Sequence, residues 1–252
     1  MKEPMEDPTR RFTERAEGYA RYRPGYPEGF IDSCVTRVPP PAAVADIGSG
    51  TGILSRPFLE RGYPVWAVEP NDAMRRRAET DLSGEENFHS VRGRGESTNL
   101  DDHTCRLVCC AQSFHWFANE VAVREISRVT QIGGIVCLVW NRRRTDDPFS
   151  SAYHELIERY AVSIGRADHR DLLFDTISSL FEGRTITHER FDNVQKLEWD
   201  ALWGRVQSSS YAPGPDHPSY EPLRREMRKL FDAQSKRPIE FFYDTEAYFI
   251  EI

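Results

Sequence analysis

Short apolar runs alternate with amphipathic segments between residues 42 and 140. This alternation is typical of a parallel sheet built from strand–helix–strand units, because each crossover helix packs back onto the sheet. Strands are predicted at 43–47, 64–69, 87–91, 106–111 and 134–140. The pattern therefore predicts an α/β fold with a parallel core.

Two helices are predicted between these strands. The clearer one covers 119–130, where apolar residues recur on one face and a Gly-Gly pair follows. The first crossover helix is predicted within 53–61. It should begin near Ile53 or Leu54, because Pro57 is tolerated only in a first helical turn.

The pattern changes after Asn141. Residues 149–184 are predicted to be mainly helical, 186–198 alternate like a strand, 220–233 form a charged amphipathic helix, and 239–252 favour a strand. We expect a helical insertion after the fifth strand, followed by two strands that complete the sheet. The proline-rich stretch 213–218 is predicted to be an exposed loop.

Composition narrows the classes of protein that fit. The chain has 252 residues, 39% of them hydrophobic, which suits one core with a small appended lobe. A net charge of -7 without a basic stretch disfavours nucleic acid as a partner. The sequence has neither a long apolar run nor a signal-peptide pattern, so we expect a cytoplasmic protein without a membrane partner.

The five cysteines are odd in number and form no CxxC pair. Three of them lie in predicted core strands, where cysteine usually behaves as a small buried hydrophobe. We therefore expect no disulfide and no metal site.

The most informative segment runs from Asp46 to Gly52 and reads DIGSGTG. It joins the first predicted strand to a helix, and glycine there lets the backbone approach a ligand closely. Glu69 ends the next strand, 23 residues after Asp46, which suits a carboxylate that accepts both ribose hydroxyls. Glu96 follows the third strand as another acid. Together these features predict nucleoside binding, although a glycine turn alone can be a mere tight connection.

The spacing of the glycines distinguishes two kinds of nucleoside ligand. Dinucleotide sites typically read GxGxxG and place the pyrophosphate at a helix N-terminus, whereas this chain reads GxGxG. The Asp46 carboxylate would repel a pyrophosphate but attract the ammonium group of a methionine moiety. We therefore predict S-adenosylmethionine, with a nucleotide-dependent oxidoreductase and a nucleoside-binding protein without transfer activity as alternatives.

At these residues the chain resembles the class I S-adenosylmethionine-dependent methyltransferases, in particular the small-molecule group similar to trans-aconitate methyltransferases. The resemblance covers about residues 12–141 and includes VEPN at 68–71, GRGE at 93–96, AQSFHWF at 111–117 and an N-terminal pattern from Phe12 to Pro27. It implies a Rossmann-like, mostly parallel seven-stranded sheet with helices on both faces. It also implies an N-terminal helical lid over the cofactor.

The resemblance carries cofactor roles onto matching positions. Gly48 and Gly50 would lie against the methionine and ribose, Glu69 would hold the ribose hydroxyls, and Gln112 would reach toward the methionine end. Arg94 departs from the family pattern, which leaves the contact to the adenine amine open. The predicted cofactor site comprises Tyr19, Arg23, Asp46, Gly48, Ser49, Gly50, Thr51, Gly52, Glu69, Pro70, Asn71, Met74, Gly95, Glu96 and Gln112.

The acceptor side carries fewer signals. His115 follows the fourth strand, where ligands gather in open α/β sheets, and could act as a general base or simply pack the turn. Arg23 could hold a carboxylate of the cofactor or of an acidic acceptor. The Arg142–Arg144 run could attract an anion or be an exposed loop. The predicted acceptor site comprises Tyr26, His115, Trp116, Trp140, Asn141 and Tyr211, with Trp203 and Ser209 as further candidates.

We therefore predict a methyltransferase that uses S-adenosylmethionine, yields S-adenosylhomocysteine and acts on a small molecule. A carboxylic acid or another anionic metabolite is a candidate for this acceptor. Residues 1–41 are assigned to the lid, 42–141 to the cofactor-binding core and 142–252 to the acceptor cap with the last two strands. A monomer or homodimer is expected.

Overall fold

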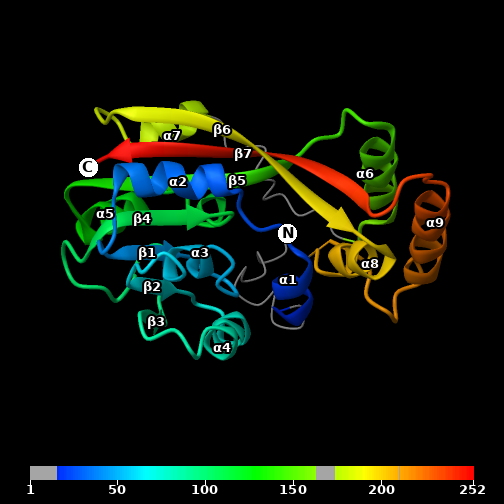
Figure 1. Cartoon of the computed structure of the whole chain (residues 1–252), viewed down its shortest axis with the longest axis horizontal. Helices are drawn as coiled ribbons and strands as arrows, with labels where there is room; N and C mark the ends of the chain where they lie inside the picture. Colours follow the sequence, from blue (N-terminus) through cyan, green and yellow to red (C-terminus); the bar gives the residue numbers. More distant parts are fainter. Residues whose placement is uncertain (1–15, 163–173, 210) are drawn as a thin grey trace, which may run out of the picture.

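The computed structural model describes residues 16–162, 174–209 and 211–252, and its centre is a seven-stranded sheet (Figure 1). The strand order is β3-β2-β1-β4-β5-β7-β6. All neighbouring pairs up to β5 are parallel, and β7 runs antiparallel to both β5 and β6. The strands are β1 (Val44–Ile47), β2 (Val65–Val68), β3 (Phe88–Val91), β4 (Cys105–Ala111), β5 (Thr130–Arg143), β6 (Ile186–Leu197) and β7 (Ile239–Glu251).

Helices cover both faces of the sheet and form a separate cap at one end (Figure 1). They are α1 (Ala16–Tyr22), α2 (Glu28–Arg37), α3 (Ser55–Leu59), α4 (Asp72–Asp81), α5 (Glu120–Val129), α6 (Pro148–Tyr160), α7 (Phe174–Leu180), α8 (Trp199–Gln207) and α9 (Tyr220–Asp232). A short 3₁₀ turn spans Phe114–Trp116. None of the described helices is long and apolar enough to cross a membrane.

The sequence explains where the crossover helices begin. The side chain of Asn119 accepts hydrogen bonds from the backbone N–H groups of Val121 and Ala122 and so caps α5. Asn71 caps α4 in the same way, through the N–H groups of Ala73 and Met74. Both caps follow strand ends, so the sheet and the helix starts fix each other's positions.

The core is divided by the sheet into two apolar clusters, one on each face. Phe30, Phe58 and Tyr63 lie in the first cluster, and Ile126 and Trp140 lie in the second. All five cysteines are buried and free, including the three that the sequence placed in core strands. The strands β1, β2 and β4 read as continuous apolar runs because both of their faces are covered.

A third apolar cluster holds the cap together. It joins α6, α8 and α9 to the ends of β6 and β7 through residues such as Tyr153, Met227 and Phe241. In Figure 1 these helices gather beyond the end of the sheet, with α1 beside α8. Gly204 of α8 lets Tyr22 of α1 pack closely, because a Cβ at Gly204 would lie 2.2 Å from that ring.

The predicted strands and the helices at 119–130 and 220–233 are confirmed within one or two residues, except that β5 extends further at both ends. The first crossover helix begins at Ser55, after Leu54, also close to the prediction. Helices α6 and α7 form the predicted insertion after the fifth strand, and α8, which was not predicted, lies with the predicted α9 between β6 and β7. Residues 163–173 of the predicted helical segment, and Phe12 of the N-terminal pattern, lie outside the described residues.

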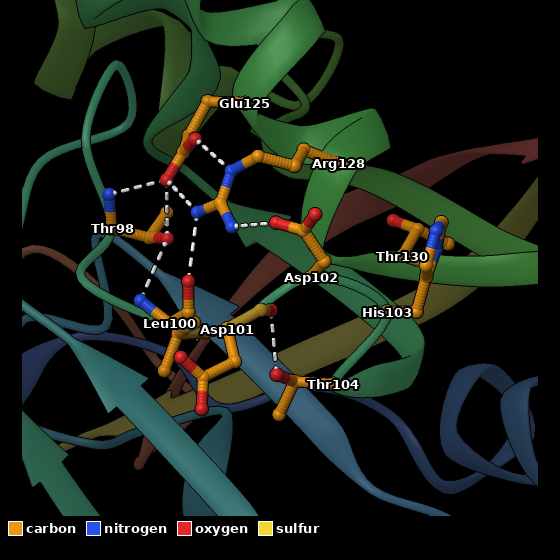
Figure 2. A network of polar contacts seen from close by, with 9 residues as sticks. All are labelled: Thr98, Leu100, Asp101, Asp102, His103, Thr104, Glu125, Arg128 and Thr130. Carbon is orange, nitrogen blue, oxygen red and sulfur yellow. Dashed lines mark hydrogen bonds and ion pairs between the residues drawn. The ribbon is translucent and has the colours of Figure 1, made fainter.

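A network of polar contacts fastens α5 to the loop before β4 (Figure 2). Glu125 accepts hydrogen bonds from the N–H and hydroxyl of Thr98, at 2.7 and 2.6 Å, and pairs with Arg128 at 2.8 Å. Arg128 in turn contacts Asp102 and the carbonyl oxygen of Leu100. The network thus holds Thr98, which follows the 93–96 turn, against α5.

Candidate cofactor and acceptor site

The glycine turn after β1 requires glycine for two different reasons. Gly48, Gly50 and Gly52 have φ values of +72°, +57° and +80°, a region that other residues rarely adopt. At Gly48 a Cβ would also lie 2.6 Å from the Cβ of Ser113, whereas at Gly50 nothing lies within 4 Å. Gly48 is therefore held against β4, and Gly50 faces open space.

Glu69 stands beside that open space. Its two carboxylate oxygens accept hydrogen bonds from the backbone N–H groups of Gly50, at 2.9 Å, and Asn71, at 2.7 Å. The side chain is buried, and burial raises the pKa of Glu69 although the two hydrogen bonds oppose the shift. Each oxygen keeps a lone pair that can accept a hydroxyl from a ligand.

Asp46 lies beneath the turn and is almost fully buried. One oxygen, Oδ2, accepts a hydrogen bond from the Ser55 hydroxyl at 2.8 Å, while Oδ1 has no partner within the described chain. Burial raises the pKa of Asp46 to about 7, an effect partly opposed by the Ser55 hydrogen bond. The hydroxyls of Ser49 and Thr51 are likewise buried without a partner among the described residues.

A cleft of about 220 Å³ opens over the ends of β1, β2 and β4. Its position at the carboxyl ends of parallel strands is where open α/β sheets bind ligands. The lining residues are Tyr19, Gly48, Gly50, Glu69, Pro70, Asn71, Met74, Arg94, Gly95, Glu96, Ala111, Gln112, Ser113, Trp116 and Phe117.

Ten of the fifteen predicted cofactor residues line this cleft. The structure places the other five, Arg23, Asp46, Ser49, Thr51 and Gly52, outside the lining. Gly52 faces the end of α4 instead, because a Cβ there would lie 2.8 Å from Leu82, which directly follows that helix. Asp46, Ser49 and Thr51 are buried in or directly beneath the turn itself.

Four lining residues fall outside the predicted site, namely Arg94, Ala111, Ser113 and Phe117. Ser113 donates a hydrogen bond to the carbonyl oxygen of Ile47 at 2.6 Å, which ties the end of β4 to the end of β1. A Cβ at Gly95 would lie 2.3 Å from the Phe117 ring, so the Gly95 backbone packs directly against that ring. The glycine at 95 was the one sequence signal of such a close neighbour.

Of the predicted acceptor residues, only Trp116 lines the cleft. Trp140 is buried in the sheet, and its indole N–H donates to Nδ1 of His115 at 3.3 Å. A ring that accepts at Nδ1 carries its proton at Nε2. His115 therefore packs against Trp140 in a single tautomer.

Asn141 and Tyr26 support the segment between α1 and α2. Asn141 donates to the carbonyl oxygen of Gly25 at 3.0 Å and accepts from Thr245 at 2.6 Å and Asn193 at 3.1 Å. Tyr26 packs on Phe30 with ring centroids 5.6 Å apart, and burial raises its pKa well above the usual value. These contacts hold the segment between α1 and α2 in place.

The sheet order, the glycine turn after β1 and the buried acid after β2 together define the class I methyltransferase fold. Residues 45–138 match the family model described as a methyltransferase domain. Over these residues the chain is similar to methyltransferase domains, which agrees with the resemblance based on its motifs. The narrower likeness to trans-aconitate methyltransferases stays a prediction.

Relatives in sequence agree with this assignment. An uncharacterized methyltransferase of Mycobacterium tuberculosis (strain H37Rv) is 37% identical over 134 residues, which cover 52% of each chain. An uncharacterized methyltransferase of Schizosaccharomyces pombe is 27% identical over 253 residues, which cover 95% of this chain and 96% of the relative. The match to the mycobacterial protein spans about half of that relative's length.

Solved structures share the fold. A protein described as a type II methyltransferase from Anaeromyxobacter dehalogenans superposes with a TM-score of 0.68 at 19% identity, over 90% of this chain and 97% of that one. An S-adenosylmethionine-dependent methyltransferase from Geobacter sulfurreducens, solved with S-adenosylhomocysteine, superposes with a TM-score of 0.53 at 14% identity. That superposition covers 96% of this chain and 97% of the other.

Proposed function

We propose that this protein is an S-adenosylmethionine-dependent methyltransferase that transfers a methyl group to a small-molecule acceptor and releases S-adenosylhomocysteine. The observation that carries the proposal is the pair of buried carboxylates, Asp46 and Glu69, at the glycine turn. Burying two ionisable groups without an ion-pair partner is costly unless a ligand completes their contacts.

The residues present fit this cofactor. Glu69 would accept the two ribose hydroxyls, and the open space at Gly50 would admit the ribose beside it. Oδ1 of Asp46 lacks a partner within the described chain and would attract the ammonium group of the methionine moiety. Met74, Phe117 and Gly95 give the cleft an apolar wall that suits the adenine.

When bound, S-adenosylmethionine supplies a methyl group on a positively charged sulfur, and a nucleophilic atom of the acceptor displaces that sulfur. The protein contributes chiefly by orienting the two reactants and by excluding water from the cleft. Tyr19 and Gln112 line the cleft from α1 and the end of β4. The hydrogen bond from Trp140 favours a packing role for His115 over a role as general base.

The cofactor assignment is tested by calorimetric titration with S-adenosylhomocysteine. We expect wild-type protein to bind it, and Glu69→Gln to weaken binding by about 1.5–3 kcal/mol, the scale of hydrogen bonds to a charged group. Glu60→Gln, at the exposed position that directly follows α3, is the matched control. Unchanged affinity in Glu69→Gln would contradict the ribose assignment, and binding of NADH instead would favour an oxidoreductase.

Further features of the protein are part of the proposal. The five unbridged cysteines suit a reducing, cytoplasmic location. The net charge of -7 supports a small molecule rather than nucleic acid as the acceptor. We retain a monomer or homodimer, with residues 1–41 as lid, 42–141 as cofactor-binding core and 142–252 as the part that selects the acceptor.

A further inference from the structure

Three arginines lie where the cap meets the start of the chain. Arg143 is the last residue of β5, Arg205 lies on α8, and Arg23 directly follows α1. No acid pairs with any of the three within the part of the chain that the structure describes. On either side of Arg143, by contrast, Arg142 pairs with Glu246 at 2.7 Å and Arg144 pairs with Asp244 at 2.5 Å.

The three unpaired arginines are poorly satisfied by the protein itself. Arg205 is 5% exposed; its Nε donates to the Tyr243 hydroxyl at 2.8 Å, but its NH1 has no partner among the described residues. The Nε atoms of Arg143 and Arg23 are also buried without a described hydrogen-bond partner. The Nε of Arg142 is too, but it has the Glu246 carboxylate beside it. A buried guanidinium without a counter-charge is strongly unfavourable, so an anion is the missing partner.

Tyrosines surround the three guanidinium groups. The Arg143 guanidinium lies 4.5 Å from the centroid of the Tyr153 ring, and the Tyr153 hydroxyl has no described partner. Burial raises the pKa of Tyr211, but Arg23, Arg205, a hydrogen bond with Ser209 and Arg143 together outweigh it and lower that pKa. The Arg143 and Arg205 guanidinium groups each lie 5.7 Å from the centroid of the Phe241 ring. The Ser209 hydroxyl, to which Arg23 donates, also donates to the Arg205 carbonyl oxygen at 3.4 Å, so the three arginines lie close together.

This arginine cluster, Arg23, Arg143 and Arg205, is connected to the cofactor cleft. The Arg23 guanidinium lies 5.1 Å from the centroid of the Tyr19 ring, and Tyr19 lines the cleft. Arg23 also donates to the Ser208 carbonyl oxygen at 3.2 Å and to the Ser209 hydroxyl at 3.3 Å, next to the end of α8. Figure 1 shows α1 beside α8 at this place. The cluster thus lies on the cap side of the cleft, where the acceptor is expected.

We propose that Arg143, Arg205 and Arg23 bind a carboxylate of the methyl acceptor, so that the substrates are small carboxylic acids. This inference rests on the function proposed above. Guanidinium groups match carboxylates and phosphates alike. A carboxylate is favoured because a singly charged ion costs less to bring into a site walled by aromatic rings.

The position of the cluster also restricts where the methyl group goes. The three arginines do not line the cleft, so the carboxylate that they bind is an anchor and stays ionised. A second nucleophilic group of the acceptor, which reaches the cleft, forms the new bond to the methyl carbon. The carbon–sulfur bond breaks, its electrons stay on the sulfur of S-adenosylhomocysteine, and any proton of the nucleophile passes to solvent.

The test uses succinate as the probe and succinamide as its neutral match, titrated into the protein saturated with S-adenosylhomocysteine. We expect succinate to bind wild type and succinamide to bind at least about tenfold more weakly, the difference a charged hydrogen-bonding pair makes. Arg205→Gln and Arg143→Gln should each weaken succinate binding by about tenfold or more while the affinity for S-adenosylhomocysteine stays within about twofold. Arg142 already pairs with Glu246, so Arg142→Gln should bind succinate like wild type.

The outcomes separate the two proposals. If S-adenosylhomocysteine does not bind wild type, the cofactor assignment fails. If it binds but succinate does not bind, or binds equally to wild type and both variants, the arginine cluster is not an anchor. If inorganic phosphate competes more strongly than succinate, the ligand class is a phosphate and the carboxylate assignment is overturned. If Arg205→Gln does not fold, Arg143→Gln, at the less buried position, is used for the same measurement.

Discussion

Asp46 is buried, and one of its carboxylate oxygens has no partner in the described chain. We therefore expect ligand binding at the glycine turn to depend on whether this carboxyl group is ionised. Its pKa is raised to about 7 by burial. Because an ammonium group binds only the ionised form, we expect the affinity for S-adenosylhomocysteine to rise between about pH 6 and pH 8. Titrations across this range measure the effect.

Two variants isolate Asp46 in that experiment. Asp46→Asn should bind more weakly at pH 8 and lose the pH dependence. Ser55→Ala removes a hydrogen bond that lowers the Asp46 pKa, so it should move the rise in affinity to higher pH. An Asp46→Asn profile as steep as that of wild type would assign the pH dependence to another group.

The same raised pKa has a consequence for stability. Between about pH 4 and pH 7 the folded protein holds a proton on Asp46 that the unfolded chain releases, so stability falls as the pH rises through this window. Thermal melts of the ligand-free protein should show this fall, and Asp46→Asn should reduce it. A melting temperature that rises steadily from pH 4 to pH 7 in both proteins would contradict the assignment.

His115 is a second residue whose role can be measured. Because its Nδ1 accepts from Trp140, we expect His115→Ala to keep its affinity for S-adenosylhomocysteine and to lose less activity than the roughly hundredfold typical of a missing general base. Single-turnover rates on an identified acceptor measure the loss. A loss of a hundredfold or more with unchanged cofactor binding would establish His115 as the base.

Some residues of the candidate site could be predicted from the sequence, and others could not. The residues with a distinct chemical signal, Gly48, Gly50 and Glu69, do border the cleft. Ser113 and Phe117 were missed because their contacts depend on β1 and the 93–96 turn, which lie far away in the sequence. Asn141 bonds to the Gly25 carbonyl oxygen, a contact that the sequence does not reveal, because a polar residue at a strand end looks the same whether it meets a ligand or holds a loop.

At the scale of elements, Glu125 is the residue on which the α5 network depends (Figure 2). Its hydrogen bonds with Arg128 and Thr98 lower its pKa to about 2. The carboxylate therefore adds stability above its unfolded pKa of about 4.5 that is lost as the pH falls through about 2. We expect Glu125→Gln to destabilise the fold by about 1–3 kcal/mol at pH 7, measured by urea unfolding.

The matched control is Glu120→Gln on the same helix. Glu120 is 84% exposed and makes a single ion pair with Arg124 at 3.4 Å, so its loss should cost well under about 1 kcal/mol. The difference between wild type and Glu125→Gln should narrow at pH 3, because the unfolded wild-type chain has by then taken up a proton on Glu125 that the folded protein does not hold. Equal costs for the two variants would mean that the network adds no more than an exposed pair.

Element order was the less predictable part of the fold. The core strands followed from continuous apolar runs, which local sequence displays directly. The position of α8 did not, because residues 199–207 bury only Leu202, Arg205 and Val206, and one of these is charged. A helix that buries an arginine against tyrosines leaves no amphipathic pattern to read.

At the scale of the whole molecule, β6 and β7 make the sheet and the cap one cooperative unit. Their pairing runs without interruption from Ile186 and Ile250 within the sheet to Leu197 and Ile239 beside the cap helices. Separating the cap would break this ladder, so we expect one unfolding transition for both parts. Far-ultraviolet circular dichroism and the fluorescence of tryptophans, which lie in both parts, should give the same midpoint.

Ligand binding tests this coupling from the cofactor side. S-adenosylhomocysteine at about 100 times its dissociation constant stabilises the state that binds it by about 2.7 kcal/mol. Because Trp199 and Trp203 lie on α8 in the cap, a probe of these two residues, such as fluorine-labelled tryptophan, should show the same rise in melting temperature as the sheet. If the cap signal melts first and does not respond to the ligand, then the cap is a separate folding unit. The acceptor would in that case be bound by a part of the protein that does not sense the cofactor.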